Sequence, residues 1–167
     1  MTEEGSRVHE TELAQPLCTA LTIGVVNQLK RWGLQPSAVI GHSSGEMVAA
    51  YASGAITAVS AIKIAYYRGI VAKSQEGRGG MTAVALGWKK VLEYLQEFDG
   101  VSIACRNGPG STVISGQTEE LGLVAGRIKQ DFPEVFCRKL RVSVPYHSSK
   151  NAYPRPIQDS YFGVVLF

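Results

Sequence analysis

The stretch Gly41-His42-Ser43-Ser44-Gly45 has the form G-x-S-x-G and stands between two segments of different character. A short apolar run, Ser37 to Ile40, precedes it, and a helix-like run, Glu46 to Ala52, follows it. A serine on a tight strand-to-helix turn is held above the sheet, where a base can reach its hydroxyl, and the glycines let the backbone turn closely. The pattern predicts a nucleophile elbow with Ser43 as nucleophile. The N–H of Ser44, at the start of the next helix, would face a developing oxyanion.

Apolar spacing on either side of the elbow indicates helices. One predicted helix ends near Trp32, with Gly33 as the residue after its cap, and its apolar stripe contains Leu13, Leu17, Leu21, Val25 and Leu29. After the elbow, Gly54 ends a helix and Thr57 is placed to cap the next one. That later helix is expected to turn five residues toward a core: Val59, Ile62, Ala65, Tyr66 and Ile70.

The pattern changes after the glycine-rich loop at residues 77–80, where we place a subdomain boundary. Strand-like and helix-like segments then alternate: Met81 to Leu86, Lys89 to Phe98, Val101 to Arg106, Thr112 to Ser115, Thr118 to Asp131 and Phe136 to Val144. Their order is β-α-β-β-α-β, the ferredoxin-like unit. We therefore expect an α/β core at residues 1–80, a ferredoxin-like subdomain at 81–146, and a return segment at 147–167 with a divergent, apolar tail.

Composition excludes several classes of protein. Hydrophobic residues make up 45% of the 167 residues and charged residues 19%, which is typical of a globular chain. The net charge is +3, and the 17 Lys and Arg are scattered among 14 Asp and Glu, which argues against nucleic-acid binding. Cys18, Cys105 and Cys137 show no metal-ligand spacing, so we expect no metal and a reducing compartment. The polar start and the lack of a long apolar run favour a cytoplasmic location away from membranes.

Several phrases together resemble the malonyl-CoA:acyl-carrier-protein transacylase family, in particular the acyltransferase domains of fungal-type iterative polyketide synthases. The phrases are Gly41 to Glu46, Ala49 to Ile56, Tyr67-Arg68-Gly69, Ala104 to Pro109 and Val144 to Ser148. The resemblance runs from about Glu12 to Ser149. It implies an α/β fold made of a partial α/β-hydrolase-like acyltransferase subdomain with a ferredoxin-like insert.

The resemblance also implies roles for single residues. Ser43 matches the nucleophile, His147 the general base, and Arg68 the arginine that grips the free carboxylate of malonyl. Ser44 matches one oxyanion donor, while Gln15 and Asn107 match residues that line the site. Tyr146 lies in the stretch that influences the choice of extender unit, and its aromatic ring favours unbranched malonyl.

The reaction implied is transfer of a malonyl unit from CoA to the phosphopantetheine thiol of an acyl carrier protein, through an acyl-serine, in polyketide or fatty-acid biosynthesis. No bound cofactor is expected; malonyl-CoA is the substrate, and phosphopantetheine is carried by the partner. The chain is expected to be part of a larger multidomain synthase.

Two departures from the family leave alternatives open. The family's N-terminal Gly-Gln-Gly strand, which supplies a second oxyanion donor, is absent, and the match fails from about Lys150. These departures predict a domain truncated at both ends. A serine esterase that shares the elbow, or a non-catalytic remnant of an acyltransferase domain, therefore remains as an alternative.

Overall fold

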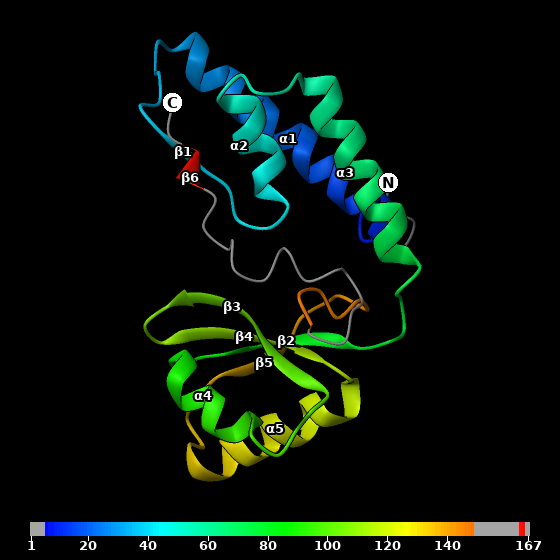
Figure 1. The fold of residues 1–167 in the computed structure, drawn as a ribbon, viewed down its shortest axis with the longest axis vertical. Helices are drawn as coiled ribbons and strands as arrows, with labels where there is room; N and C mark the ends of the chain where they lie inside the picture. The colour runs from blue at the N-terminus through cyan, green and yellow to red at the C-terminus, as the bar shows by residue number, and fades with distance from the viewer. Residues whose placement is uncertain (1–5, 149–163, 166–167) are drawn as a thin grey trace. The chain divides into compact units, whose positions relative to one another are not determined.

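The computed structural model describes residues 6–148 and 164–165, and these form two compact units (Figure 1). The first contains residues 6–74 and 164–165, and the second contains residues 75–148. The fold is of the α/β class, with a partial acyltransferase-type core and a ferredoxin-like subdomain, as the sequence predicts. The predicted tail segment lies largely outside the described residues.

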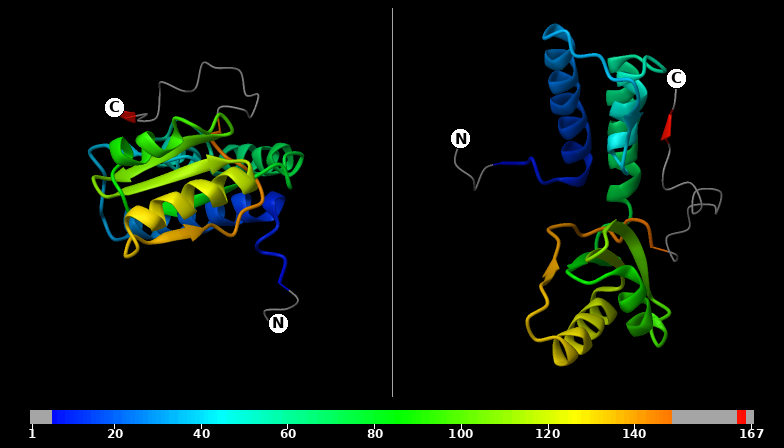
Figure 2. Two further views of the ribbon diagram at one scale, coloured as in Figure 1. Left: turned by 90° about the horizontal axis from the view of Figure 1, so that it is seen from below. Right: turned by 90° about the vertical axis from the view of Figure 1, so that its left-hand side faces the viewer.

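Three helices dominate the first unit: α1 (Thr11–Arg31), α2 (Gly45–Ala52) and α3 (Ala58–Lys73). Helices α1 and α3 run side by side, as Figure 2 shows. Strand β1 (Val39–Ile40) precedes the elbow and pairs antiparallel with β6 (Val164–Val165).

The predicted ends of two helices are confirmed. Gly33 has φ +80° after α1, and the N–H groups of Gly33 and Leu34 donate to the carbonyls of Lys30 and Leu29, which is the Schellman pattern. The side chain of Thr57 accepts a hydrogen bond from the N–H of Ser60 at 3.1 Å, so Thr57 is the N-cap of α3.

The apolar stripe of α1 is largely exposed, and the core face expected for α3 is confirmed at Ala65 but wrong at Val59, Tyr66 and Ile70. On α1 the buried residues are Gln15, Thr19 and Ile23, while Leu17, Leu21, Val25 and Leu29 are exposed. On α3 the buried residues are Ala61, Ala65, Gly69 and Ala72; Ile62 is half-buried, and Val59, Tyr66 and Ile70 are exposed. Small side chains fill this interface because the backbones approach closely. A Cβ at Gly69 would lie 2.9 Å from the Cα of Glu12.

The second unit contains a four-stranded sheet and two helices, in the order β2 (Gly80–Val84), α4 (Trp88–Leu95), β3 (Val101–Gly108), β4 (Ser111–Gly116), α5 (Thr118–Asp131) and β5 (Cys137–Lys139). The strands lie in the order β3-β4-β2-β5, and every neighbouring pair is antiparallel. This order is the ferredoxin-like arrangement. Helices α4 and α5 cover one face of the sheet (Figure 1).

Apolar side chains are buried on both faces of this sheet. On the face toward α4 and α5, Val84 and Ile114 pack with Val91, Val124 and Ile128. On the other face, Met81, Ala104 and Val113 pack with Leu140, Val142 and Tyr146. The predicted strand from Phe136 to Val144 is therefore too long. Strand β5 ends at Lys139; the N–H of Leu140 still donates to the carbonyl of Met81 at 2.9 Å, and Leu140, Val142 and Tyr146 then pack across the second face.

The described residues contain neither a candidate membrane span nor a candidate metal site. No helix among them is long and apolar enough to cross a bilayer. No group of three or more His, Cys, Asp or Glu side chains among them is arranged to hold a metal ion.

Candidate active site

Ser43 lies in a tight turn between β1 and α2, with φ at 54°. A non-glycine residue with such a φ is uncommon and strained. Gly41 makes the turn possible, because a Cβ there would lie 2.4 Å from the Cα of Glu46 and 2.5 Å from its nitrogen. Gly45 has no such role, since a Cβ there meets no described residue within 4 Å. Within residues 6–148 and 164–165, only the first glycine of the G-x-S-x-G pattern is sterically required.

The hydroxyl of Ser43 is joined to two side chains from other helices. Arg68 on α3 donates from Nη2 to Ser43 Oγ at 3.1 Å, and its Nη1 donates to Gln15 Oε1 on α1. Gln15 is 8% exposed, and Arg68 is half-buried. The guanidinium is therefore fixed between a buried amide and the serine. This joins three residues that are far apart in the sequence.

The backbone around Ser44 leaves a donor available at the start of α2. The N–H of Gly45 donates to the carbonyl of His42 at 2.9 Å, and that of Glu46 donates to the carbonyl of Ser43 at 3.2 Å. Within the described residues the N–H of Ser44 donates no hydrogen bond. The carboxylate of Glu46 is in the first turn of the helix, where the helix dipole favours a negative charge. An oxyanion beside Ser44 would benefit from the same dipole.

His147 lies in the second unit, in a turn with φ at 59°. The N–H of Ser148 donates to the carbonyl of Pro145 at 3.3 Å and closes this turn. Pro145 in turn packs at Gly79: a Cβ at Gly79 would lie 3.0 Å from the Cβ of Pro145 and 2.2 Å from the oxygen of Gly116. Close backbone packing thus supports the turn that carries the histidine.

Two further candidates also belong to the second unit. Asn107 lies exposed on β3, which runs through the predicted turn as far as Gly108. Tyr146 is half-buried against the second face of the sheet, where it packs with Met81, Ala104 and Val113. Part of the Tyr146 ring therefore serves packing, and its influence on the substrate stays a prediction.

The structure thus brings Ser43, Arg68 and Gln15 together, with Ser44 beside them, in one unit. Asn107, Tyr146 and His147 lie in the other unit, and their approach to Ser43 stays a prediction. Among the described residues, the non-glycine residues with positive φ are Ser43 and His147. Backbone strain of this kind collects at functional sites. The two strained positions coincide with the two residues to which the resemblance gives the chemistry.

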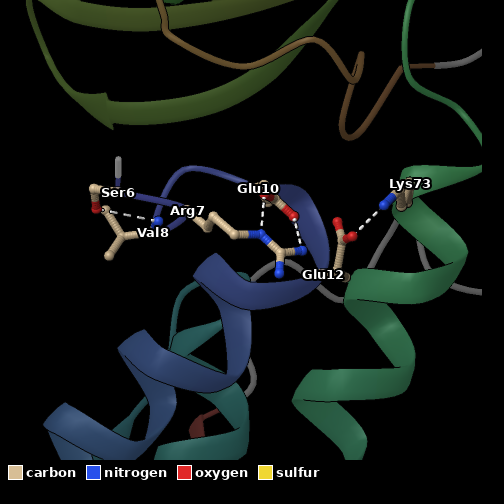
Figure 3. A network of polar contacts seen from close by, with 6 residues as sticks. All are labelled: Ser6, Arg7, Val8, Glu10, Glu12 and Lys73. Carbon is tan, nitrogen blue, oxygen red and sulfur yellow. Dashed lines mark hydrogen bonds and ion pairs between the residues drawn. The ribbon is translucent and has the colours of Figure 1, made fainter. Parts of the chain in front are cut away.

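Sequence reasoning missed a pair of charged residues next to this cluster. Glu12 on α1 accepts a hydrogen bond from Lys73 on α3, and Figure 3 shows this pair near the bidentate contact of Arg7 with Glu10, at 2.5 and 2.7 Å. The hydrogen bond from Lys73 lowers the pKa of the Glu12 carboxyl. Glu12 and Lys73 meet because α1 and α3 approach closely at Gly69. Nothing local in the sequence indicates that approach.

Comparisons with known proteins identify the family of this chain. The family described as acyl transferase domain matches residues 1–159. The chain is 52% identical over 146 residues to the highly reducing polyketide synthase g433 of a Fusarium species, and 48% identical over 145 residues to the highly reducing polyketide synthase FUM1 of Gibberella moniliformis. In both cases the match covers 87% of this chain, which spans 6% of the length of these curated relatives.

Solved structures give the same result. The acyltransferase domain from module 8 of the salinomycin polyketide synthase superposes with a TM-score of 0.80 at 30% identity, covering 88% of this chain and 34% of that one. The malonyl-CoA:ACP transacylase of Synechocystis superposes with a TM-score of 0.73 at 26% identity, covering 85% of this chain and 48% of that one. The chain therefore belongs to the acyl transferase domain family of enzymes.

Proposed function

We propose that this chain transfers a malonyl unit from CoA to the phosphopantetheine thiol of an acyl carrier protein, through an acyl intermediate on Ser43. The observation that carries the proposal is the hydrogen bond from Arg68 to the hydroxyl of Ser43, in a turn with positive φ. A cation fixed at the nucleophile indicates a substrate with an anionic group very close to the reacting carbonyl.

Malonyl meets that requirement because its free carboxylate is separated from the thioester carbonyl by a single methylene. The guanidinium of Arg68 presents a planar fork that binds a carboxylate through two parallel hydrogen bonds. One nitrogen of the fork already donates to Gln15, so the orientation of the plane is set before substrate arrives. A longer dicarboxylate would place its anion farther from Ser43 than Arg68 lies.

The proposed reaction has two halves. Ser43 Oγ attacks the thioester carbon while its proton passes to His147, and the oxyanion is stabilised by the N–H of Ser44. The C–S bond then breaks, and CoA leaves as a thiol with the proton returned by His147. In the second half the thiol of phosphopantetheine attacks the acyl-serine, with His147 again moving the proton. No cofactor is required for either half.

The relatives suggest the setting of this reaction. They are named as highly reducing polyketide synthases, and this chain spans 6% of the length of g433. We infer that the chain acts as one domain of a large multidomain synthase in polyketide biosynthesis. Its partner would be an acyl carrier protein, and its location would be the cytoplasm. Tyr146 would favour unbranched malonyl over a branched extender unit.

The test is covalent labelling of the 167-residue chain with radiolabelled malonyl-CoA, with the labelled peptide identified by mass spectrometry. We expect label on Ser43 in the native chain and none in Ser43→Ala. Absence of label in a chain with a folded circular-dichroism spectrum would overturn the proposal. Arg68→Ala should abolish labelling by malonyl-CoA while acetyl-CoA, which lacks the carboxylate, still reacts.

The serine esterase alternative makes the opposite prediction for Arg68. A neutral ester has no group for the guanidinium to bind, so Arg68→Ala would leave ester hydrolysis intact. Ester turnover by the native chain, without any malonyl label, would favour that alternative.

A further inference from the structure

We propose that Glu12 and Lys73 are positioning residues that hold Arg68 in place for the substrate carboxylate, without touching the substrate themselves. The role in substrate binding rests on the malonyl transfer proposed above. The positioning of Arg68 itself rests on the geometry of α1 and α3 alone.

The first step is the point where the two helices meet. The Cα of Glu12 would lie 2.9 Å, and the carbonyl oxygen of Thr11 3.0 Å, from a Cβ at Gly69. No side chain separates the backbones here, so Gly69 is a contact point about which α1 and α3 can shift or rotate.

Two polar bridges flank that contact. On one side Arg68, next to Gly69 in sequence, donates to Gln15, which lies about one turn along α1 from Glu12. On the other side Lys73, about one turn beyond Gly69 on α3, donates to Glu12 (Figure 3). A shift of α1 along α3 would lengthen at least one of the two bridges. The Glu12–Lys73 pair therefore sets the alignment in which Gln15 meets Arg68.

The environment of the pair shows which partner is fixed. The side chain of Glu12 is 12% exposed, whereas that of Lys73 is 50% exposed. One oxygen of the Glu12 carboxylate, Oε2, is buried and has no hydrogen-bond partner within the described residues. Removing the ammonium would leave a nearly buried carboxylate without its counter-charge, which favours displacement of the helix end toward water.

Such a displacement would be felt at the active site because the guanidinium of Arg68 is hydrogen-bonded to Gln15 on α1. An error of about 1 Å in a positioned group is enough to reduce catalysis by up to about 10²-fold. We expect the grip on the carboxylate to weaken, while the chemistry at Ser43 with a neutral acyl group is unaffected.

The kinetic test compares Lys73→Met with Lys73→Arg, Glu12→Gln and the control Lys63→Met in the same 167-residue chain. Lys63 is an exposed lysine on the same helix. Lys73→Met and Glu12→Gln should raise KM for malonyl-CoA about tenfold, the equivalent of one weakened charge-assisted hydrogen bond, with kcat within about twofold. Lys73→Arg should restore KM, and Lys63→Met and the KM for acetyl-CoA should be unchanged.

A second readout does not depend on turnover. The Nε–H signal of Arg68 in a nitrogen-15 NMR spectrum, assigned with Arg68→Lys, should exchange faster with solvent in Lys73→Met than in the native chain or Lys63→Met. If the native chain takes no malonyl but the Arg68 signal responds in this way, the proposed function fails and the positioning role stands. An unchanged Arg68 signal in Lys73→Met overturns the positioning role. Equal loss of activity toward malonyl-CoA and acetyl-CoA also overturns it, because it indicates a merely structural pair.

Discussion

The two units bury their side chains in contrasting ways. In the second unit, both faces of the sheet are covered by large apolar residues, with Val91, Ile114, Val124 and Ile128 completely buried. In the first unit, small residues fill the interface between α1 and α3. Large apolar residues of α1 and α3 are exposed, among them Leu17, Leu21, Val59 and Tyr67. The second unit is thus held by a conventional core. The first has an apolar cluster of Ile23, Met47, Val48, Ala61 and Ala65, and close backbone packing at Gly69 lies alongside a polar chain from Gln15 through Arg68 to Ser43.

The largest expected effect tests this contrast directly. Ile114→Ala in the second unit should reduce the free energy of unfolding by about 2–5 kcal/mol, because the side chain is fully buried and leaves a cavity. Leu21→Ala in the first unit should cost no more than about 0.5 kcal/mol, since Leu21 is 73% exposed. Urea unfolding of both variants, followed by circular dichroism, measures the difference. An equal decrease in the free energy of unfolding for both variants would show that the apolar face of α1 is covered in solution. The two units would then not differ in how they bury apolar side chains.

The next effect concerns the elbow, where the first unit depends on backbone contact. Gly41→Ala would force a Cβ against the backbone of Glu46, so Ser43 should be displaced and its acylation slowed by about 10²-fold. Gly45→Ala is the matched control: it meets open space, replaces glycine by a better helix former, and should leave the rate nearly unchanged. The rate of label incorporation from malonyl-CoA measures both. Similar rates in the two variants would contradict the steric argument for Gly41.

Local patterns predicted most helices and strands of both units, but not which side of α1 is buried and only part of the buried side of α3. Gly33 and Thr57 act at helix ends through contacts within a few residues, so sequence was sufficient for them. The stripe through Leu21 and Val25 marks an apolar face but not a neighbour, and the structure packs α1 through Thr19 and Ile23 instead.

Contacts between residues far apart in the sequence could not be predicted from local sequence patterns, for a related reason. Alternating apolar residues from Phe136 onward are typical of a strand and equally of a segment that packs across a sheet. The predicted strand is therefore longer than β5. In the site, the elbow is readable from Gly41 and Ser43 alone. Arg68 and Gln15 were suggested only by family resemblance, because their meeting depends on the approach of two helices at Gly69.

A smaller effect compares helix starts in the two units. Thr57→Ala removes the hydrogen bond that caps α3 and should reduce the free energy of unfolding by about 1 kcal/mol. Gln117→Ala in the second unit is the matched change. Gln117 precedes α5 and makes no side-chain cap, so the effect should be much smaller. Thermal unfolding of the two variants checks this order, and a larger loss for Gln117→Ala would reverse it.

The smallest effect is a pH dependence confined to the second unit. The phenol of Tyr94 on α4 donates to Asp131 on α5 at 2.5 Å, and this hydrogen bond raises the pKa of Tyr94 from 10.0 to about 12. A raised pKa means that the stabilisation is complete below the unfolded pKa near 10 and is lost as the pH rises through about 12.

Alkaline unfolding, followed by tyrosinate absorbance, should therefore show one late-titrating tyrosine in the native chain. Tyr94→Phe should remove that component and flatten the stability profile above pH 10. Persistence of the late component in Tyr94→Phe would assign it to another tyrosine.

The positive φ angles at Ser43 and His147 have a consequence for protein engineering. A left-handed backbone at a residue with a side chain costs about 1–3 kcal/mol, and glycine relieves most of that cost. Ser43→Gly and His147→Gly are therefore expected to stabilise the fold while removing the proposed nucleophile and base. A screen that selects this chain for thermal stability alone would select away its chemistry, so any stabilisation programme must hold these two positions fixed.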